Sequence, residues 1–329
     1  MEQRQTTNLP DGQAGHKLQT LRIIFMGTPD FAVASLGALV NAGCDIISVI
    51  TAPDKAAGRG MKLTESAVKK YAVEKDLKIL QPEKLKNPVF IEELKSLKAD
   101  LQIVVAFRML PEIVWNMPPM GTINLHGSLL PQYRGAAPIT WAIINGEKET
   151  GVTTFKLKHE IDTGDILLSE RIPIGENETA GELHDKMKII GANLLVRTVS
   201  GLAEGSLQER AQRLVIDHQP SDLKHAPKIF TETCKIDWGK SVNEVYNLIR
   251  GLSPFPGAFT YFDNKMLKIF RAEKEETATT LAPGNFETDK KTCLRFATAN
   301  GYIYLKEIQL EGKKKMGIED FLRGYRMQS

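Results

Sequence analysis

Short apolar runs alternate with amphipathic stretches along the first part of the chain. The run Leu21–Met26 ends at Gly27, and an apolar run bounded by glycine and proline is typical of a buried strand. Residues 31–42 follow with apolar side chains at helical spacing, and residues 45–50 and 101–106 are two further runs of strand length. Strands that alternate with helices predict βαβ units and a parallel sheet, and therefore an α/β domain.

A long helix is predicted near the end of this first domain. Residues 179–182 have the Ser/Thr-x-x-Glu form of a capping box, and Leu183, Met187, Ile190 and Leu194 then recur at helical spacing. This helix is expected to close the first domain near residues 201–205. Residues 206–226 are polar and without clear periodicity, which predicts a linker.

The pattern changes from Pro227 onward. Four short β-like stretches are separated by turn residues, at 258–262, 266–270, 293–297 and 302–308. One helix is predicted at 242–250. These elements predict a small second domain that resembles a β-barrel.

Composition places the chain among ordinary globular proteins. Of its 329 residues, 42% are hydrophobic and 25% are charged, which argues against disorder and collagen. The longest apolar runs are far too short to span a bilayer. Residues 1–20 lack the apolar core of a signal peptide and are predicted to be a polar tail, so we expect a cytoplasmic protein with no membrane partner.

Charge and cysteine content narrow the possible partners. The 43 basic residues barely exceed the 40 acidic ones, but residues 221–329 hold 18 basic and 14 acidic side chains, a modest tilt towards a polyanionic partner. Cys44, Cys234 and Cys293 are far apart, which argues against a disulfide framework. The six histidines show no metal-ligand spacing, so no metal is expected.

A nicotinamide-dependent enzyme is disfavoured by the turn after the first strand. Gly27–Asp30 lies where a dinucleotide fingerprint belongs, but it supplies one glycine of G-x-G-x-x-G. Pro29 also removes a backbone donor that would face a phosphate. A tight strand-to-helix turn is the simpler interpretation.

Candidate chemistry gathers between residues 122 and 165. Asn124 and His126 lie two residues apart at a predicted strand end, so their side chains point the same way, towards the ligand crevice of a parallel sheet. Asp162 lies on a turn between two β-like stretches. An amide, an imidazole and a carboxylate form a plausible acid/base and oxyanion set. The alternatives remain open, since a buried histidine is usually just hydrogen-bonded and Asp before Thr-Gly is usually a turn former.

The chain also carries longer motifs, in order and with consistent spacing. They are FMGTPDFA (25–32), APDKAAGRGMKL (52–63), INLHGSLLPQYRGAAPI (123–139), HEIDTGDIL (159–167), NLIRGLSPFPGAF (247–259) and MGIEDFLRG (316–324). With these motifs, nearly the whole chain from residue 21 resembles the methionyl-tRNA formyltransferase family, part of the wider folate-dependent formyltransferase group.

The resemblance implies both a fold and an activity. It implies a Rossmann-like open-sheet catalytic domain without a nucleotide (21–206), a linker (207–226) and a smaller OB-like β-barrel domain that binds tRNA (227–329). It also implies formyl transfer from 10-formyltetrahydrofolate, the co-substrate, to the amino group of methionine on initiator tRNA. We expect the protein to act as a monomer.

Residue roles also follow from the resemblance. The family's catalytic residues fall on Asn124, His126 and Asp162. Its tetrahydrofolate-contacting loop falls on Ser128, Leu129, Leu130 and Pro131. Its tRNA-entering loop falls on 52–63, where Arg59 and Lys62 are the basic residues assigned to tRNA binding.

Other functions compete with this interpretation. A formyltransferase for a small amine, such as glycinamide ribonucleotide or an amino sugar, and a formyltetrahydrofolate hydrolase would share the three catalytic residues. Both leave the roughly 100 residues after Pro227 without a purpose. A non-catalytic RNA-binding protein would have no use for the Asn–His–Asp set, and a nucleotide-sugar dehydrogenase lacks the required glycines.

Overall fold

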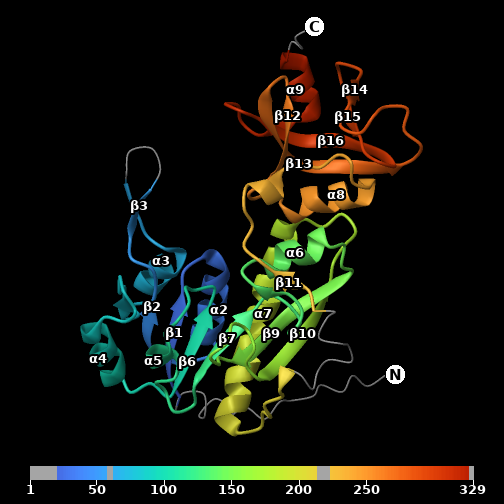
Figure 1. The fold of residues 1–329 in the computed structure, drawn as a ribbon. Coiled ribbons are helices and arrows are strands. Elements are labelled where there is room, and N and C mark those ends of the chain that lie inside the picture. Colours follow the sequence, from blue (N-terminus) through green and yellow to red (C-terminus); the bar gives the residue numbers. More distant parts are fainter. Residues whose placement is uncertain (1–20, 58–61, 213–222, 326–329) are drawn as a thin grey trace, which may run out of the picture. The chain divides into compact units, whose positions relative to one another are not determined.

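The computed structural model describes residues 21–57, 62–212 and 223–325, and its chain forms two compact units (Figure 1). The predicted polar tail at 1–20 lies outside the described residues. Unit 1 comprises the described residues of 1–132, 151–171 and 186–223, and unit 2 those of 133–150, 172–185 and 224–329. The two units are defined by contacts between residues, so each unit combines several separate segments of the chain. The domain boundaries predicted at 21–206, 207–226 and 227–329 stay predictions.

Unit 1 is built on a seven-stranded sheet of order β10-β9-β7-β6-β1-β2-β5. Its strands are β1 (Arg22–Gly27), β2 (Asp45–Ile50), β5 (Ile79–Leu80), β6 (Leu101–Val105), β7 (Thr122–His126), β9 (Glu149–Lys156) and β10 (Ile166–Pro173). The first five are mutually parallel, which confirms the predicted Rossmann-like sheet. Strand β9 pairs antiparallel with β7, which the sequence did not indicate.

Helices cover this sheet because its central strand is apolar on both faces. Residues 23–26 of β1 are all fully buried, as expected for a parallel strand between two helical layers. The helices are α2 (Asp30–Asn41), α3 (Ala67–Glu74), α4 (Pro88–Ser96), α5 (Glu112–Trp115) and α7 (Ala180–Glu204). Polar caps start several of them: the Ser66 hydroxyl accepts from Lys69 N at 3.0 Å, and Asn87 Oδ1 accepts from Val89 N at 2.9 Å.

The predicted capping box precedes α7. Glu182 N donates to Thr179 Oγ1 at 3.3 Å, and Thr179 N donates to Glu182 Oε2 at 2.8 Å. Further along α7, Gly191 packs on β7: an added Cβ would lie 3.0 Å from Leu125 Cδ2. A small residue there lets the helix approach the strand that carries the candidate chemistry.

Unit 2 is built on an antiparallel sheet of order β12-β13-β16-β15-β14, with β17 beside β16 (Figure 1). Its strands are β12 (Ala258–Phe262), β13 (Lys265–Glu276), β14 (Phe286–Thr288), β15 (Leu294–Ala297), β16 (Gly301–Leu310) and β17 (Met316–Gly317), and α6 (Pro138–Ile144), α8 (Val242–Gly251), the 3₁₀ turn η3 (Glu232–Cys234) and α9 (Ile318–Gly324) accompany it. Short strands β8 (Arg134–Gly135) and β11 (His225–Ala226) pair with each other. The predicted small β domain is confirmed as a curled half-barrel sheet.

The core of unit 2 is rich in aromatic side chains. Trp238 stacks on Phe296 with ring centroids 4.6 Å apart, and Phe262 packs against Phe321. The indole N–H of Trp238 donates to Thr260 Oγ1 at 3.0 Å, which satisfies its buried polar atom. Large rings supply the buried area that a small domain needs.

Candidate active site

Strand β7 carries Asn124 and His126 on one face, because side chains two residues apart in a strand point the same way. His126 is buried and lies opposite Thr153 of β9, while Asn124 is half-buried and lies opposite Phe155. Across residues 21–57, 62–212 and 223–325, no group hydrogen-bonds to the Asn124 side chain. The Asn124 amide therefore keeps its donors for a ligand.

Asp162 faces His126 from the segment between β9 and β10. Asp162 Oδ2 lies 3.8 Å from His126 Nδ1, and the two side chains are only 11% and 8% exposed. This distance is within the range of an ion pair but longer than a direct hydrogen bond. The structure thus brings the predicted imidazole and carboxylate together in a largely buried place.

The turn that presents Asp162 is held by backbone contacts. Asp162 itself has a left-handed φ of +54°, and Gln212 Nε2 donates to the carbonyl oxygens of Asp162 and Gly164 at 2.8 Å each. A Cβ at Gly164 would lie 1.5 Å from the carbonyl oxygen of Lys156, so no other residue fits that position. The carboxylate position therefore depends on Gln212 and Gly164.

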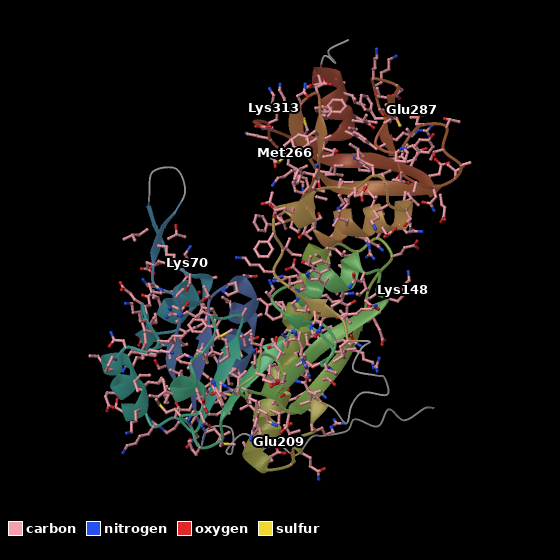
Figure 2. The ribbon with its side chains drawn as sticks, viewed as in Figure 1. Lys70, Lys148, Glu209, Met266, Glu287 and Lys313 are labelled. Carbon is pink, nitrogen blue, oxygen red and sulfur yellow. The ribbon has the colours of Figure 1, made fainter. Side chains whose placement is uncertain are left out.

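Gln212 is brought to this turn by the segment that follows α7. Glu209, labelled in Figure 2, pairs with Lys156 Nζ of β9 at 2.5 Å. Arg210 and Ile166 exchange two backbone hydrogen bonds, of 2.8 and 2.9 Å. Sequence reasoning missed Gln212, because it lies in the polar stretch interpreted as a linker and no local signal marks its long-range contact.

The loop after β7 is fixed by Thr153. The Thr153 hydroxyl donates to the carbonyl oxygen of Ser128 at 2.7 Å and accepts from Leu130 N at 3.2 Å. The Ser128 hydroxyl donates to the carbonyl oxygen of Gln132 at 2.6 Å, so it is committed to the loop itself. Because Thr153 also lies opposite His126, one side chain sets the loop relative to the imidazole.

Apolar packing completes the placement of this loop. Leu130 is buried in a small cluster with Phe155 and Ile166. Leu129 rests on Gly151, where an added Cβ would lie 2.4 Å from Leu129 Cδ2. Pro131 is buried as well. The four predicted loop residues therefore have a defined backbone path next to β7.

A cavity of about 420 Å³ lies at the carboxyl edge of the parallel strands in unit 1. Thr28, Ala52 and Phe107 line it, and each follows the end of a strand, β1, β2 or β6. Ligand sites of open α/β sheets lie at this edge, and the volume is in their usual range. His126 ends β7 at the same edge.

Two cations line the cavity, Lys55 and Arg108. Arg108 donates to the carbonyl oxygens of Glu83, at 2.8 Å, and Pro82, and burial lowers the pKa of its guanidinium. These hydrogen bonds connect Arg108 in the cavity wall to the loop that follows β5.

The predicted tRNA-entering loop has an ordered base. Strands β3 (Lys55–Ala57) and β4 (Lys62–Thr64) pair antiparallel. Lys69 Nζ lies 2.5 Å from Asp54 Oδ2, and Gln81 Nε2 donates to Asp54 Oδ1 at 2.8 Å. The hydrogen bond from Lys69, then that from Gln81, hold the pKa of Asp54 below its ordinary value. Arg59 lies outside the described residues, and Lys62 begins β4.

Membrane-spanning helices and metal-ligand clusters are both absent from the described residues. These residues contain no helix that is long and apolar enough to cross a membrane. They also contain no group of three or more His, Cys, Asp or Glu side chains arranged to hold a metal ion. The expectation that no metal is needed stays a prediction.

Comparison with known proteins covers both units. A family model described as formyl transferase matches residues 21–199, and a model described as formyl transferase, C-terminal domain, matches residues 228–326. The chain is 51% identical over 316 residues to a methionyl-tRNA formyltransferase of Bacteroides fragilis, covering 94% of this chain and 97% of the relative. It is 54% identical over 312 residues to that of Phocaeicola vulgatus, with 93% and 96% covered.

A solved structure supports the fold. The N-formyltransferase of Helicobacter canadensis, in complex with folinic acid and dTDP-3-aminofucose, superposes with a TM-score of 0.66 at 20% identity. The match covers 90% of this chain and all of that one. At this identity the likeness concerns the fold alone.

Proposed function

The chain belongs to the formyl transferase family, and from this premise we propose that it transfers the formyl group of 10-formyltetrahydrofolate to the amino group of methionine on initiator tRNA. One observation carries the proposal: methionyl-tRNA formyltransferases match nearly the whole chain at about half identity, through both units.

The side-chain amide of Asn124 stabilises the charge that develops during transfer. When an amine attacks a formyl carbon, negative charge grows on the formyl oxygen. Asn124 lacks a protein partner within the described chain, so its N–H groups are available to that oxygen. A donor of this kind is worth about 2.7–4 kcal/mol in the transition state.

His126 and Asp162 act in the transfer of the proton that the attacking amine loses. The imidazole shares a face with Asn124, and Asp162 Oδ2 lies 3.8 Å from its Nδ1. A ring N–H of His126 donates to the same oxygen, and either His126 or a water held by Asp162 takes the proton from the amine and passes it to the leaving nitrogen. General acid–base steps of this kind contribute about 10²–10⁴-fold.

The residues present fit a folate co-substrate, which supplies the formyl carbon. The loop of Ser128, Leu129, Leu130 and Pro131 has a fixed backbone beside the catalytic face, and we assign it to hold the folate. The unpartnered amide of Asn124 and the cavity at the same sheet edge leave room for a ligand.

The acceptor tRNA is bound by the basic loop and by the C-terminal region. Lys62 begins strand β4 of a hairpin whose base is anchored by Asp54 and Lys69, and Arg59 precedes it in the sequence. Residues 221–329 carry the excess of 18 basic over 14 acidic side chains, which suits backbone phosphates. We assign the protein to the cytoplasm as a monomer that needs no metal in catalysis.

Formyl transfer assayed with several acceptors tests the proposal. Purified protein and 10-formyltetrahydrofolate are mixed with methionine-charged initiator tRNA, methionine-charged elongator tRNA, glycinamide ribonucleotide or an amino sugar, and the formylated product is detected by mass. The proposal expects formylmethionine on the initiator alone. Transfer to a small amine, or folate cleavage without transfer, contradicts it.

A further inference from the structure

Phe255 is the most exposed large hydrophobic side chain among the described residues. It lies in the loop between α8 and β12 of unit 2 and is 83% exposed. Isolated exposed hydrophobic residues are common on globular proteins, so exposure by itself assigns nothing. The surroundings of Phe255 distinguish it.

The loop that carries Phe255 is held on both sides. Gly257 N donates to the carbonyl oxygen of Leu252 at 2.9 Å, and Gly181 N donates to that of Ser253 at 3.0 Å. Leu252 and Ser253 are buried, and Lys268 Nζ donates to the carbonyl oxygen of Pro256 at 2.9 Å. The ring is thus presented from a fixed base, so little conformational entropy is lost when a ligand binds it.

The other exposed aromatic residues of unit 2 each have a ring contact. Lys228 Nζ lies 5.8 Å from the Phe230 centroid. Tyr261 meets Phe259 edge to face at 6.0 Å, and Phe286 packs on Phe262 at 5.0 Å. Throughout the described part of the chain, the ring of Phe255 has no aromatic or cation–π partner. Contacts between rings, or between a ring and a cation, therefore do not explain why an aromatic side chain occupies position 255.

The two units differ in the kind of hydrophobic side chain that they expose. Among the described residues of unit 1, the exposed large hydrophobic side chains are non-aromatic, namely Leu63, Val73, Val89, Met109, Ile113, Ile161 and Ile189. Among the described residues of unit 2 they are aromatic, namely Phe230, Phe255, Tyr261 and Phe286. Flat rings next to cations are the usual means of holding unstacked bases.

We propose that Phe255 is a stacking platform for an unpaired base at the acceptor end of the tRNA. The inference rests on the proposed function, which supplies an RNA partner. One face of the ring takes the base, and Lys268 Nζ, which donates to the carbonyl oxygen of Pro256, adds a positive charge to the same loop. Stacking of this kind tolerates any base, since every base has a π face.

A protein partner fits the surroundings of Phe255 less well. Protein interfaces have a buried core several side chains wide, whereas both sequence neighbours of Phe255 are prolines and Ser253 and Gly257 beyond them are buried. A single flat ring with a neighbouring lysine suits one base.

Binding by full-length variants tests the proposal. The Kd for charged initiator tRNA is measured at fixed salt for the wild type, Phe255→Ala, Phe255→Leu and Phe255→Trp. Stacking predicts a Kd about 5- to 150-fold weaker for Phe255→Ala. Phe255→Leu, which keeps apolar area without a π face, loses nearly as much, and Phe255→Trp keeps or gains affinity. Phe230→Leu is the matched control, an exposed ring of the same unit with its own contact.

Fluorescence identifies the stacked base. 2-Aminopurine is placed at each unpaired acceptor-end position in turn, and stacking quenches it at one position with the wild type and with Phe255→Trp only. Equal Kd values for all variants, full affinity in Phe255→Leu, or quenching at no position overturns the proposal. If the wild type binds and formylates initiator tRNA and the Phe255 variants bind it with the same Kd, this inference alone is refuted. A wild type that neither binds nor formylates the tRNA refutes the proposed function and this inference with it.

Discussion

Two polar side chains, one in each unit, have opposite surroundings. In unit 2, the buried guanidinium of Arg250 donates to Asn247 Oδ1 at 2.9 Å and to the carbonyl oxygens of Gly175 and Glu178 at 3.3 and 3.1 Å. In unit 1, the half-buried amide of Asn124 has no hydrogen-bond partner within residues 21–57, 62–212 and 223–325. The fold thus binds Nε and Nη1 of Arg250, whereas it leaves the Asn124 amide for a ligand.

This difference distinguishes polar groups that stabilise the fold from polar groups that remain available to a ligand. A buried polar group without a partner costs roughly 1–3 kcal/mol, so folds usually satisfy such groups from within. Exceptions concentrate where a ligand completes the bonding. Unit 1 keeps donors for a reacting group, and unit 2, with the Arg250 guanidinium bonded to its own carbonyl oxygens and with aromatic rings exposed, is suited to holding a partner.

The largest expected effect is that of Asp162→Asn. Asparagine tolerates the left-handed φ of +54°, so the turn persists while the charge facing His126 is lost. We expect kcat for formyl transfer to fall by about 10²–10⁴-fold. Steady-state kinetics give this value, and thermal unfolding serves as the control for an intact fold. Near wild-type kcat/KM would remove Asp162 from the mechanism.

Gln212→Met tests whether the Asp162 turn needs its support. The substitution keeps the side-chain length but leaves the carbonyl oxygens of Asp162 and Gly164 without their donor, at roughly 1–3 kcal/mol of stability. A displaced carboxylate is expected to lower kcat by about 10- to 100-fold. Glu209→Gln, which removes only a surface ion pair of the same segment, is the matched control. Equal kcat in both variants would show that Gln212 does not position Asp162.

Thr153→Val is expected to act on the folate loop more than on catalysis. Without the hydroxyl, the carbonyl oxygen of Ser128 and the N–H of Leu130 lose their common partner. We expect the KM for 10-formyltetrahydrofolate to rise about tenfold, equivalent to about 1.4 kcal/mol. Thr154→Val removes a neighbouring buried hydroxyl that bonds Thr198 instead, and should leave this KM unchanged. A rise of KM in both variants would point to general destabilisation.

The smallest effect concerns the pH dependence of unit 2. Burial raises the pKa of Glu182, but hydrogen bonds from Arg271 and Thr179 outweigh it and lower the value from 4.5 to about 2. A lowered carboxyl pKa stabilises the fold above the ordinary value, and this contribution is lost as pH falls from about 4.5 to about 2. Because the Glu182 side chain is 46% exposed, Glu182→Gln should cost less than about 1 kcal/mol at neutral pH.

Thermal unfolding of the full chain between pH 2 and pH 7 measures this contribution. The wild type and Glu182→Gln should converge near pH 2, and their difference should reach its full size by about pH 4.5. A constant difference across the range would exclude the ion pair with Arg271 as its cause.

Local patterns predicted the elements better than the contacts between them. The strands at 45–50 and 258–262, and the capping box at 179–182, follow from apolar spacing and from residue types that act on their neighbours. The direction shared by Asn124 and His126 follows from strand geometry. None of these needs knowledge of distant residues.

Long-range partners could not be predicted in this way. Gln212 reaches the Asp162 turn across 50 positions of sequence, and nothing in its polar surroundings indicates this. Nothing in the sequence around Thr153 indicates that its hydroxyl donates to the loop after β7. Phe255 lies between prolines, a pattern that predicts a turn but not an exposed ring with buried neighbours.

Single-turnover formylation by the wild type and by Asn124→Ala tests the central claim most directly. With saturating 10-formyltetrahydrofolate and charged initiator tRNA, the wild type should form formylmethionyl-tRNA, and Asn124→Ala should do so about 10²–10³-fold more slowly, with an unchanged Kd for the tRNA. The chemistry would then depend on the side-chain amide of Asn124. Equal rates in the two proteins, or no formylmethionine from the wild type, would contradict the account.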